Sequence, residues 1–449
     1  MSKTNRRNVL RAGAAVSAGI VTGTVFNPGD TEAQYSPKQG CGSTWEHEYD
    51  FGHKMLFMDE YHQATLEILG RLSGEIDHIG ELSSRSVNVI KRGGTVYNSI
   101  NIGHQPIYET KENHRGNPGH MKDHDGFDEM KKGDMVYTNQ CTRAVQKARD
   151  RGVYVVCATV NYINNEFRPE NYTNPNEDDL LLKDVSNDIL HSHVPHTQGL
   201  VHAPEIPEIS ICPSTTTGSG SLHWMLCAEI ANKLTNKKAP EVEKSTEYLR
   251  TLTERVEQLS MYRSRISETA VTMARRIRAG GQWFVKGVEH QGLWIELSNV
   301  ECGPFIVNKG SWDEKNDNDI LLIPAMSPAY PDEVKLAMEK QLAGAYVIAV
   351  APSSLDGKVP HGRLLDIADE GFDNLSPESG GVIGIKGMKD TICPTSGIVG
   401  NIIQQMICSQ WVDEMVRRGS VPYFYQGVCQ IGGRELNKVM MPFFNRQGF

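Results

Sequence analysis

Two stretches of the chain carry an apolar stripe at helical spacing. In residues 242–278, apolar side chains recur at steps of three and four, as at Leu252 and Val256. Such spacing places them on one face of a helix. Residues 63–91 carry the same stripe 187 positions earlier, where Leu69 corresponds to Val256, and a Gly-Gly pair follows each stretch. The pattern therefore predicts two equivalent long amphipathic helices.

Short apolar runs follow each predicted helix, in the same order in both halves of the chain. A helical segment precedes the third run of each set, and a further run opens another helix. Strands that alternate with helices and are apolar throughout are typical of a parallel sheet covered on both faces. The runs are 95–99, 133–137, 153–158 and 211–215 in the first half, and 282–285, 318–323, 345–350 and 392–396 in the second.

The repeat predicts an α/β fold made of two tandem three-layer αβα sandwiches with parallel sheets, packed as a pseudo-dimer. A chance likeness between two generic α/β domains is the alternative. A Lys-rich stretch with Pro240 marks the linker between the halves. The predicted divisions are a signal segment 1–33, a linker 34–58, a first domain 59–235, a linker 236–243, and a second domain with a C-terminal tail 244–449.

The amino terminus predicts export. Arg6 and Arg7 precede a weakly apolar stretch, residues 12–26, that is too short for a membrane span. This arrangement resembles the twin-arginine export signal, with cleavage near Ala33. An ordinary secretory signal or a basic tail is the alternative. Export predicts a periplasmic or other extracytoplasmic location for the mature protein.

Composition narrows the class without naming a function. Lys and Arg number 46 and Asp and Glu 55, so the formal net charge is −9, and loss of the signal segment leaves about −11. An acidic chain lacks the basic stripe of a general nucleic-acid binder. No second apolar run reaches membrane-spanning length, so we expect no membrane contact after signal removal. Nine cysteines are too few for a disulfide scaffold. Those in apolar runs are expected in the core: Cys157, Cys212, Cys227, Cys393 and Cys408.

Three loops that open helices recur in both halves and are candidate ligand sites. Ligands of open parallel sheets bind beyond the carboxyl ends of the strands. Hydroxyls and free N–H groups at a helix start can hold an anion or a hydroxyl-rich ligand, although simple helix capping by Ser or Thr is the alternative. The candidate binding residues are Gly103, Gln105, Asn139, Thr142, Arg143, Ser214, Thr215 and Thr216 in the first half, and Gly287, Gln291, Ser327, Thr395 and Ser396 in the second.

These motifs resemble the SIS (sugar isomerase) domain, an α/β module that binds phosphosugars. Residues 280–290 look like its first strand and GTGHS-type turn, and residues 318–324 are similar to its second strand. Residues 361–374, 394–396 and 421–437 resemble its later segments, and the first half matches more loosely. The resemblance implies a five-stranded parallel sheet between helices, occurring twice, and a carbohydrate-derivative ligand.

The sequence departs from that family at the loop after the second strand. Family members that bind sugar phosphates usually carry an SxSGxT-like loop there. The corresponding residues are 326–330 in the second half and 140–143 in the first, and both lack the glycine and most hydroxyls. We therefore expect a neutral sugar, a sugar acid or another polyol derivative in place of a phosphosugar.

Two histidines recur at the first candidate loop. His104 and His290 are candidate catalysts, because a neutral imidazole there could move a proton between C1 and C2 of an open-chain sugar. Glu289 could do the same or orient His290. A histidine that only contacts ligand or the neighbouring loop is the alternative. The corresponding reaction is aldose–ketose isomerisation.

Other histidines cluster in the first half. Imidazoles at this density suit a metal, as do the nearby Asp123 and Asp125, although a solvated polar loop is the alternative. The clustered residues are His114, His120, His124, His191, His193, His196 and His202.

The sequence thus predicts an exported SIS-type protein that binds a small carbohydrate derivative, without a cofactor. A sugar isomerase is the most specific activity. The alternatives are a non-catalytic sugar-binding or scaffold protein, and a metal-dependent sugar-modifying enzyme that uses the His-rich loops. A homodimer of the whole chain stays open.

Overall fold

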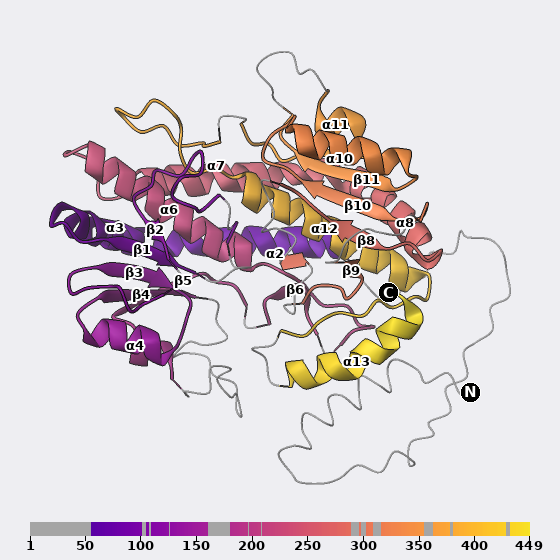
Figure 1. Ribbon diagram of the computed structural model, residues 1–449, viewed down its shortest axis with the longest axis horizontal. Coiled ribbons are helices and arrows are strands. Elements are labelled where there is room, and N and C mark those ends of the chain that lie inside the picture. Colours follow the sequence, from indigo (N-terminus) through magenta and orange to yellow (C-terminus); the bar gives the residue numbers. More distant parts are fainter. Residues whose placement is uncertain are drawn as a thin grey trace, which may run out of the picture.

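A computed structural model describes most of the chain beyond the amino terminus. The described residues are 55–100, 105–106, 109–124, 126–159, 180–195, 197–207, 209–288, 296–297, 302–308, 316–353, 362–377, 380–427 and 432–449. The predicted signal segment lies outside them. The expected α/β class with parallel sheets is confirmed, because the chain forms two five-stranded sheets in which every pairing is parallel (Figure 1).

The first sheet has the strand order β2-β1-β3-β4-β5, and the second has β9-β8-β10-β11-β12. The two orders correspond strand for strand. The registers correspond as well, since Val96 faces Met135 in the first sheet and Trp283 faces Ile320 in the second. The strands are β1 (Val96–Ser99), β2 (Lys122–Asp123), β3 (Met135–Thr138), β4 (Tyr154–Thr159), β5 (Asp188–His191), β8 (Trp283–Val285), β9 (Val307–Asn308), β10 (Ile320–Pro324), β11 (Tyr346–Ala351) and β12 (Glu370–Asp373).

The helices also correspond between halves. A small antiparallel pair, β6 (Gly199–Val201) and β7 (Ile211–Pro213), precedes α6 in the first half. The first-half helices are α2 (Phe57–Leu72), α3 (Ile76–Lys91), α4 (Arg143–Asp150), α5 (Leu182–Val185) and α6 (Thr215–Thr235). The second-half helices are α7 (Lys244–Gln258), α8 (Arg263–Arg278), α10 (Pro331–Leu342), α11 (Leu364–Ile367), α12 (Ser396–Arg417) and the C-terminal α13 (Gly433–Gln447).

The prediction of two uninterrupted long helices was wrong in one respect. A short 3-10 turn divides each one, η1 (Ser73–Glu75) between α2 and α3 and η3 (Leu259–Tyr262) between α7 and α8. The hydroxyl of Ser73 donates to the carbonyl of Gly70 at 2.6 Å, and that of Ser260 donates to Glu257 at 3.0 Å. A serine that bonds a carbonyl three residues back tightens the backbone locally. The break therefore repeats because the serine repeats.

Each sheet is the middle layer of a three-layer sandwich. Alternate residues of a strand point to opposite faces. In β4, Val155 and Cys157 pack outward with α4 and α5, whereas Val156 and Ala158 pack inward with α3 and α6. In β11 the outward residues pack with α10 and α11. The layers follow directly from this alternation.

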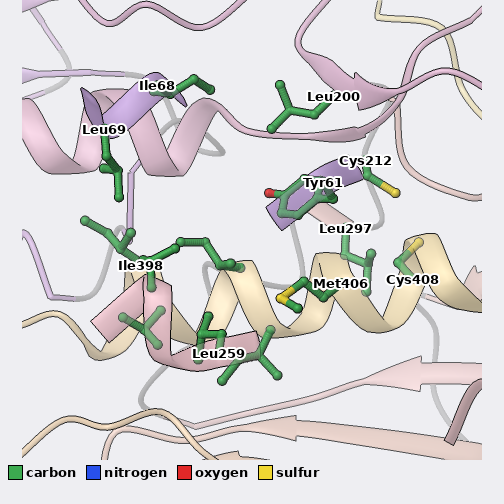
Figure 2. Packing of buried hydrophobic residues seen from close by; sticks show 14 of the residues in the cluster. Tyr61, Ile68, Leu69, Leu200, Cys212, Leu259, Leu297, Ile398, Met406 and Cys408 are labelled. Carbon is green, nitrogen blue, oxygen red and sulfur yellow. The ribbon is translucent and has the colours of Figure 1, made fainter. Parts of the chain in front are cut away.

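The two inner faces share one hydrophobic core. Helix α2 of the first half packs chiefly on α12 of the second, while α7 of the second half packs on α6 of the first. Figure 1 shows these four helices between the two sheets. Figure 2 shows Leu69 of α2 and Met406 of α12 in this core, and both are almost fully buried. The halves are therefore joined by exchanged helices.

Within the described residues, none of the helices is long and apolar enough to cross a bilayer. The five cysteines expected in the core are all buried with free thiols. Burial raises the pKa of the Cys157 and Cys227 thiols well above the usual range, which keeps both protonated.

Candidate functional site

The carboxyl ends of the strands in both sheets lead into polar groups. In the first half, the amide of Asn98 on β1 donates to the side-chain oxygen of Gln105 at 3.0 Å, and both residues are buried. In the second half, the amide of Asn374, just after β12, donates to the carbonyl of Ala325, just after β10, at 3.2 Å. These contacts hold the loops against the sheet edges.

The start of α6 lies against the end of β5. A side chain at Gly218 would contact the backbone of Ser192, immediately beyond that strand, so the helix approaches as closely as glycine allows. The buried carboxylate of Glu296, which comes from the second half, binds this helix start. Its Oε1 accepts from the Thr215 hydroxyl at 2.8 Å and from the Thr216 N–H at 3.1 Å, and its Oε2 accepts from Asn401 at 2.6 Å.

The start of α12 has the reciprocal arrangement. The buried carboxylate of Glu109, which comes from the first half, accepts from the Gly397 N–H at 2.9 Å and from the Ser396 hydroxyl. Each half therefore supplies one glutamate to the other half's helix. A carboxylate at a helix start satisfies N–H donors and opposes the positive end of the helix dipole.

These two glutamates are the residues that sequence reasoning missed. Glu109 and Glu296 are 187 positions apart, the same offset as the repeated helices. That offset was available as a signal. The histidines at 104 and 290 drew attention to an offset of 186 in the same loop, and under that alignment the glutamates do not match.

The hydroxyls of the residues before α6 and α12 do not cap these two helices. Neither Ser214 nor Thr395, the residues before α6 and α12, makes a side-chain capping bond. Ser214 instead donates to the carbonyl of Gln198 at 3.1 Å. The glutamates from the opposite half cap these helices instead, and the hydroxyls of Ser214 and Thr395 bond other partners.

The second-half site contains an arginine at a position where the first half has an isoleucine. Arg255 of α7 is half-buried, donates to the Thr395 hydroxyl, and forms no ion pair within the described residues. Burial lowers the pKa of this guanidinium from its usual value, and an arginine stays charged. The hydroxyls of Thr395 and Ser376 are 3.0 Å apart. In the first half, Ile68 occupies the position that corresponds to Arg255, so the two sites differ in charge at this position.

A second arginine reaches the same site from the first half. Arg115 donates to the Ser327 hydroxyl at 2.7 Å, and Ser327 follows β10. The neighbouring Gly116 carbonyl accepts from the Cys393 N–H at 2.7 Å. The loop around Arg115 therefore crosses between the halves and touches two of the three predicted ligand loops.

Other predicted binding residues have structural contacts. The Thr142 hydroxyl caps α4 by accepting from Val145 N–H at 3.4 Å, and Arg143 is exposed and bonds Gln146 on the same helix. Asn139, which directly follows β3, is buried. A side chain at Gly287 would collide with the Pro324 carbonyl, so this position needs glycine for close approach.

Five predicted site residues lie outside the described part of the chain. They include all three candidate catalytic residues. They are Gly103, His104, Glu289, His290 and Gln291.

Two tyrosines mark equivalent positions beside the glutamates. The hydroxyls of Tyr61 and Tyr248 donate to the carbonyls of Pro213 and Pro394, each at 3.0 Å. Burial raises the pKa of both phenols well above their usual range, and a nearby carboxylate, Glu296 or Glu109, adds to the effect. Both phenols therefore stay neutral donors.

The His-rich stretches do not converge. Among described residues, no group of three His, Cys, Asp or Glu side chains is arranged to hold a metal ion. The His191 and His193 rings are 6.2 Å apart, and His193 instead bonds Glu75 at 3.0 Å. His202 pairs with Glu60, and His124 lies against the Tyr97 ring. His196 and Asp125 lie outside the described residues.

Comparison with known proteins gives distant likenesses. No protein-family model matches the chain. Over 128 residues it is 24% identical to the UPF0309 protein ABC0887 of Shouchella clausii, a match that covers 27% of this chain and 52% of that protein. The chain thus spans about half the length of this curated relative.

Solved structures of similar shape have low sequence identity. One is a candidate sugar-binding protein from Salmonella typhimurium LT2, with 11% identity, a TM-score of 0.44, and coverage of 78% of this chain and 98% of that chain. Another is a candidate phosphosugar isomerase from Clostridium difficile 630, with 13% identity and a TM-score of 0.46. This match covers 82% of this chain and 95% of that chain. A third is the C-terminal domain of glucosamine-fructose-6-phosphate aminotransferase from Francisella tularensis, with 10% identity and a TM-score of 0.46. This match covers 81% of this chain and 97% of that chain.

Proposed function

We propose that this chain is an exported protein of the SIS type that binds a carbohydrate derivative at the junction of its two halves. The observation that carries the proposal is the reciprocal placement of Glu109 and Glu296. Each lies at a hydroxyl-bearing helix start, beside the carboxyl ends of a parallel sheet. This is the edge at which such sheets bind their ligands.

The donor set at these helix starts suits a polyol. Hydroxyl groups on a sugar both donate and accept, so they pair with carboxylates, amides and other hydroxyls. The second-half site offers the hydroxyls of Thr395, Ser376 and Ser327, together with the guanidinium groups of Arg255 and Arg115. The sequence resemblance to SIS domains points to the same ligand class.

A phosphate dianion suits these helix starts less well than a neutral or singly charged group. The N–H donors that would cradle a phosphate already bind the chain's own carboxylates, at Thr216 and at Gly397. A dianion would therefore lie close to a buried negative charge. Arg255, the half-buried guanidinium of the second-half site, can offset one negative charge, whereas the exposed Arg115 is screened by solvent, so a sugar acid fits there.

Isomerase activity is the finer part of the proposal. It assigns proton transfer to His104 and His290, with Glu289 as a second base or an orienting group. A non-catalytic sugar-binding or scaffold role is the second candidate, and the use of Glu109 and Glu296 as structural caps favours it. Deuterium exchange at C2 of a bound sugar separates the two, because a binder leaves that proton in place.

The location outside the cytoplasm is also part of the proposal and rests on the twin-arginine-like amino terminus. Replacing Arg6 and Arg7 by lysine should retain the protein in the cytoplasm of a host with that export route. Cell fractionation measures the outcome, and unchanged export would contradict this assignment.

A ligand screen tests the central claim. The mature chain is mixed with glucose, glucuronate and glucose 6-phosphate, and the shift in thermal midpoint is measured. We expect glucose or glucuronate to stabilise the wild-type protein by mass action. Stabilisation by glucose 6-phosphate alone would contradict the argument about the helix starts. No shift with any sugar at millimolar concentration would contradict sugar binding.

A further inference from the structure

A large pocket lies at the opposite edge of the first sheet from the candidate sugar site. Its volume is about 920 Å³, within the range of ligand sites. Thr95 and Asp134, which precede β1 and β3, line it, so it opens at the amino-terminal ends of the strands. The outer face of α3 and the turn at residues 131–134 form its walls.

The pocket carries a positive charge in an acidic chain. Five cations line it, and within the described part of the chain none of them forms an ion pair. They are Arg85, Arg92, Lys122, Lys131 and Lys132. The chain as a whole has a net charge of −9, so this grouping departs from the average surface.

Two of the four carboxylates in the pocket pair with cations outside its lining, and a third accepts backbone N–H groups. Asp134 accepts the Thr95 and Lys131 N–H groups, each at 2.8 Å. Asp188 pairs with His78 at 3.1 Å, and Glu241 pairs with Lys233 at 3.3 Å. The remaining one is Glu81. The five cations therefore outnumber the carboxylates that are available to them.

Arg85 is held in place for binding. Its guanidinium lies 4.0 Å from the centre of the Tyr154 ring, which fixes the side chain without neutralising it. A guanidinium held by stacking keeps its N–H groups free for a planar or tetrahedral anion.

The second half shows that these cations are not needed for the fold. Asp319 accepts the Gln282 N–H at 2.9 Å, just as Asp134 accepts Thr95, so the two edges are built alike. There, however, Arg276 crosses the equivalent place and donates to the carbonyls of Asp317 at 2.5 Å and Gly344 at 3.1 Å. The residues that correspond to Arg85, Arg92, Lys131 and Lys132 are Thr272, Ala279, Asn316 and Asp317.

We propose that this pocket is a second binding site, which takes a small polyanion with two or more carboxylate, sulfate or phosphate groups. Separated cations around one cavity match separated negative charges on one ligand. The site is independent of the sugar site, because the two lie at opposite edges of the sheet.

Isothermal titration of the full chain with citrate, inorganic pyrophosphate and a heparin-derived tetrasaccharide tests the proposal. We expect at least one probe to bind saturably and to weaken as salt is added. Exchanging Lys131→Asn and Lys132→Asp installs the second-half residues, and we expect affinity to fall by about tenfold or more. Lys335→Asn, an exposed lysine of α10, is the matched control and should bind as the wild type does.

Three results would overturn the proposal. The first is that none of the three probes binds saturably. The second is that the exchanged variant binds as tightly as the wild type while remaining folded by circular dichroism. The third is that glucose displaces the bound probe, since that would place the anion at the sugar site. Sugar binding that persists in the exchanged variant keeps the two sites distinguishable.

Discussion

At the scale of single residues, the buried glutamates are the groups on which the junction depends most. The two oxygens of Glu296 accept from donors on both sides, Thr215 and Thr216 on one and Asn401 on the other. The side-chain Oδ1 of Asn401 is itself engaged, because it accepts from the Gln404 amide at 2.8 Å. An amide in place of the carboxylate would therefore face at least one donor with its own NH₂ group.

Glu296→Gln should accordingly lower the free energy of unfolding by about 1–3 kcal/mol, the usual cost of leaving a buried donor unsatisfied. Chemical denaturation measures this loss. Glu254→Gln is the control, because the Glu254 side chain is exposed and lies 3.9 Å from Arg250, so its loss should change stability by less than about 0.5 kcal/mol. Equal effects of the two variants would contradict a special role for Glu296.

Arg255 is the residue that distinguishes the second-half site chemically from the first-half site. Arg255→Ile gives the second-half site the residue found in the first, so binding of glucuronate should weaken by about tenfold or more, while binding of glucose changes less. Calorimetry with both sugars measures the difference. Arg250→Ile, an exposed position on the same helix, should leave both affinities unchanged, and a parallel loss there would show a general effect on α7.

A network of charged residues beside β5 predicts a pH dependence. Its members are Glu75, His78, Asp188 and His193. Burial disfavours the charged form of Glu75, but hydrogen bonds from His193 and His78 outweigh it and lower its pKa to about 2. The hydrogen bond to Glu75 is the main cause that raises the pKa of His78 to about 9, with Asp188 adding to it and burial opposing it.

The sign follows from the two shifts. The stability that charged His78 adds to the folded state is fully present below its usual pKa of 6.5 and is lost as pH rises through about 9. The stability that charged Glu75 adds is fully present above its usual pKa of 4.5 and is lost as pH falls through about 2. The thermal midpoint of the wild type should thus exceed that of His78→Ala most clearly near pH 5–6, and the gap should narrow toward pH 10. A gap that widens toward pH 10 would contradict this reasoning.

At the scale of elements, the second residue of α12, Gly397, is packed too closely for any side chain larger than hydrogen. A Cβ at Gly397 would lie 2.5 Å from Glu109 Oε2 and 2.5 Å from the Pro106 side chain. A Cβ at Gly70 on α2, by contrast, would have no atom within 4 Å, and this position is exposed.

Gly397→Ala should therefore destabilise the protein by about 1–3 kcal/mol through overpacking. Gly70→Ala should stabilise it by up to about 1 kcal/mol, since alanine favours the helix more than glycine does. Denaturant unfolding of both variants measures the contrast. Loss of stability at position 70 and none at 397 would show that the Glu109 contact is not tightly packed.

Much at this scale was readable from the sequence. The two sheets and the helix that follows each of them emerged because buried strands are apolar and helices are striped, which are local patterns. The exchange of α2 and α7 between the halves left no such trace, because an apolar stripe such as that through Leu69 does not say which helix covers it. Glu109 and Glu296 were missed for a related reason. A carboxylate in a loop is expected to face solvent, and only its partner from the other half shows that it is buried.

At the scale of the whole molecule, the halves share one core. The inner faces of both sheets, and all four central helices, belong to a single cluster of buried side chains. A fragment of either half would expose the face that the exchanged helix of the other half covers. Stability is thus a property of the entire chain.

Calorimetry should accordingly show one unfolding transition for residues 55–449, with equal calorimetric and van't Hoff enthalpies. Fragments 55–235 and 244–449, produced separately, should lack cooperative unfolding and recover it when they are refolded together. Two separated transitions in the full chain, or independent folding of either fragment, would contradict the shared core.

Joining both halves in one polypeptide also changes what a single mutation can do. In a symmetric homodimer, one codon specifies two sites, so any change in one appears in the other. Here Arg255 and Ile68 are encoded separately, although they occupy corresponding positions. Selection can therefore adjust one site for its ligand while the other preserves the framework, and the reciprocal glutamates keep the two together as their surroundings diverge.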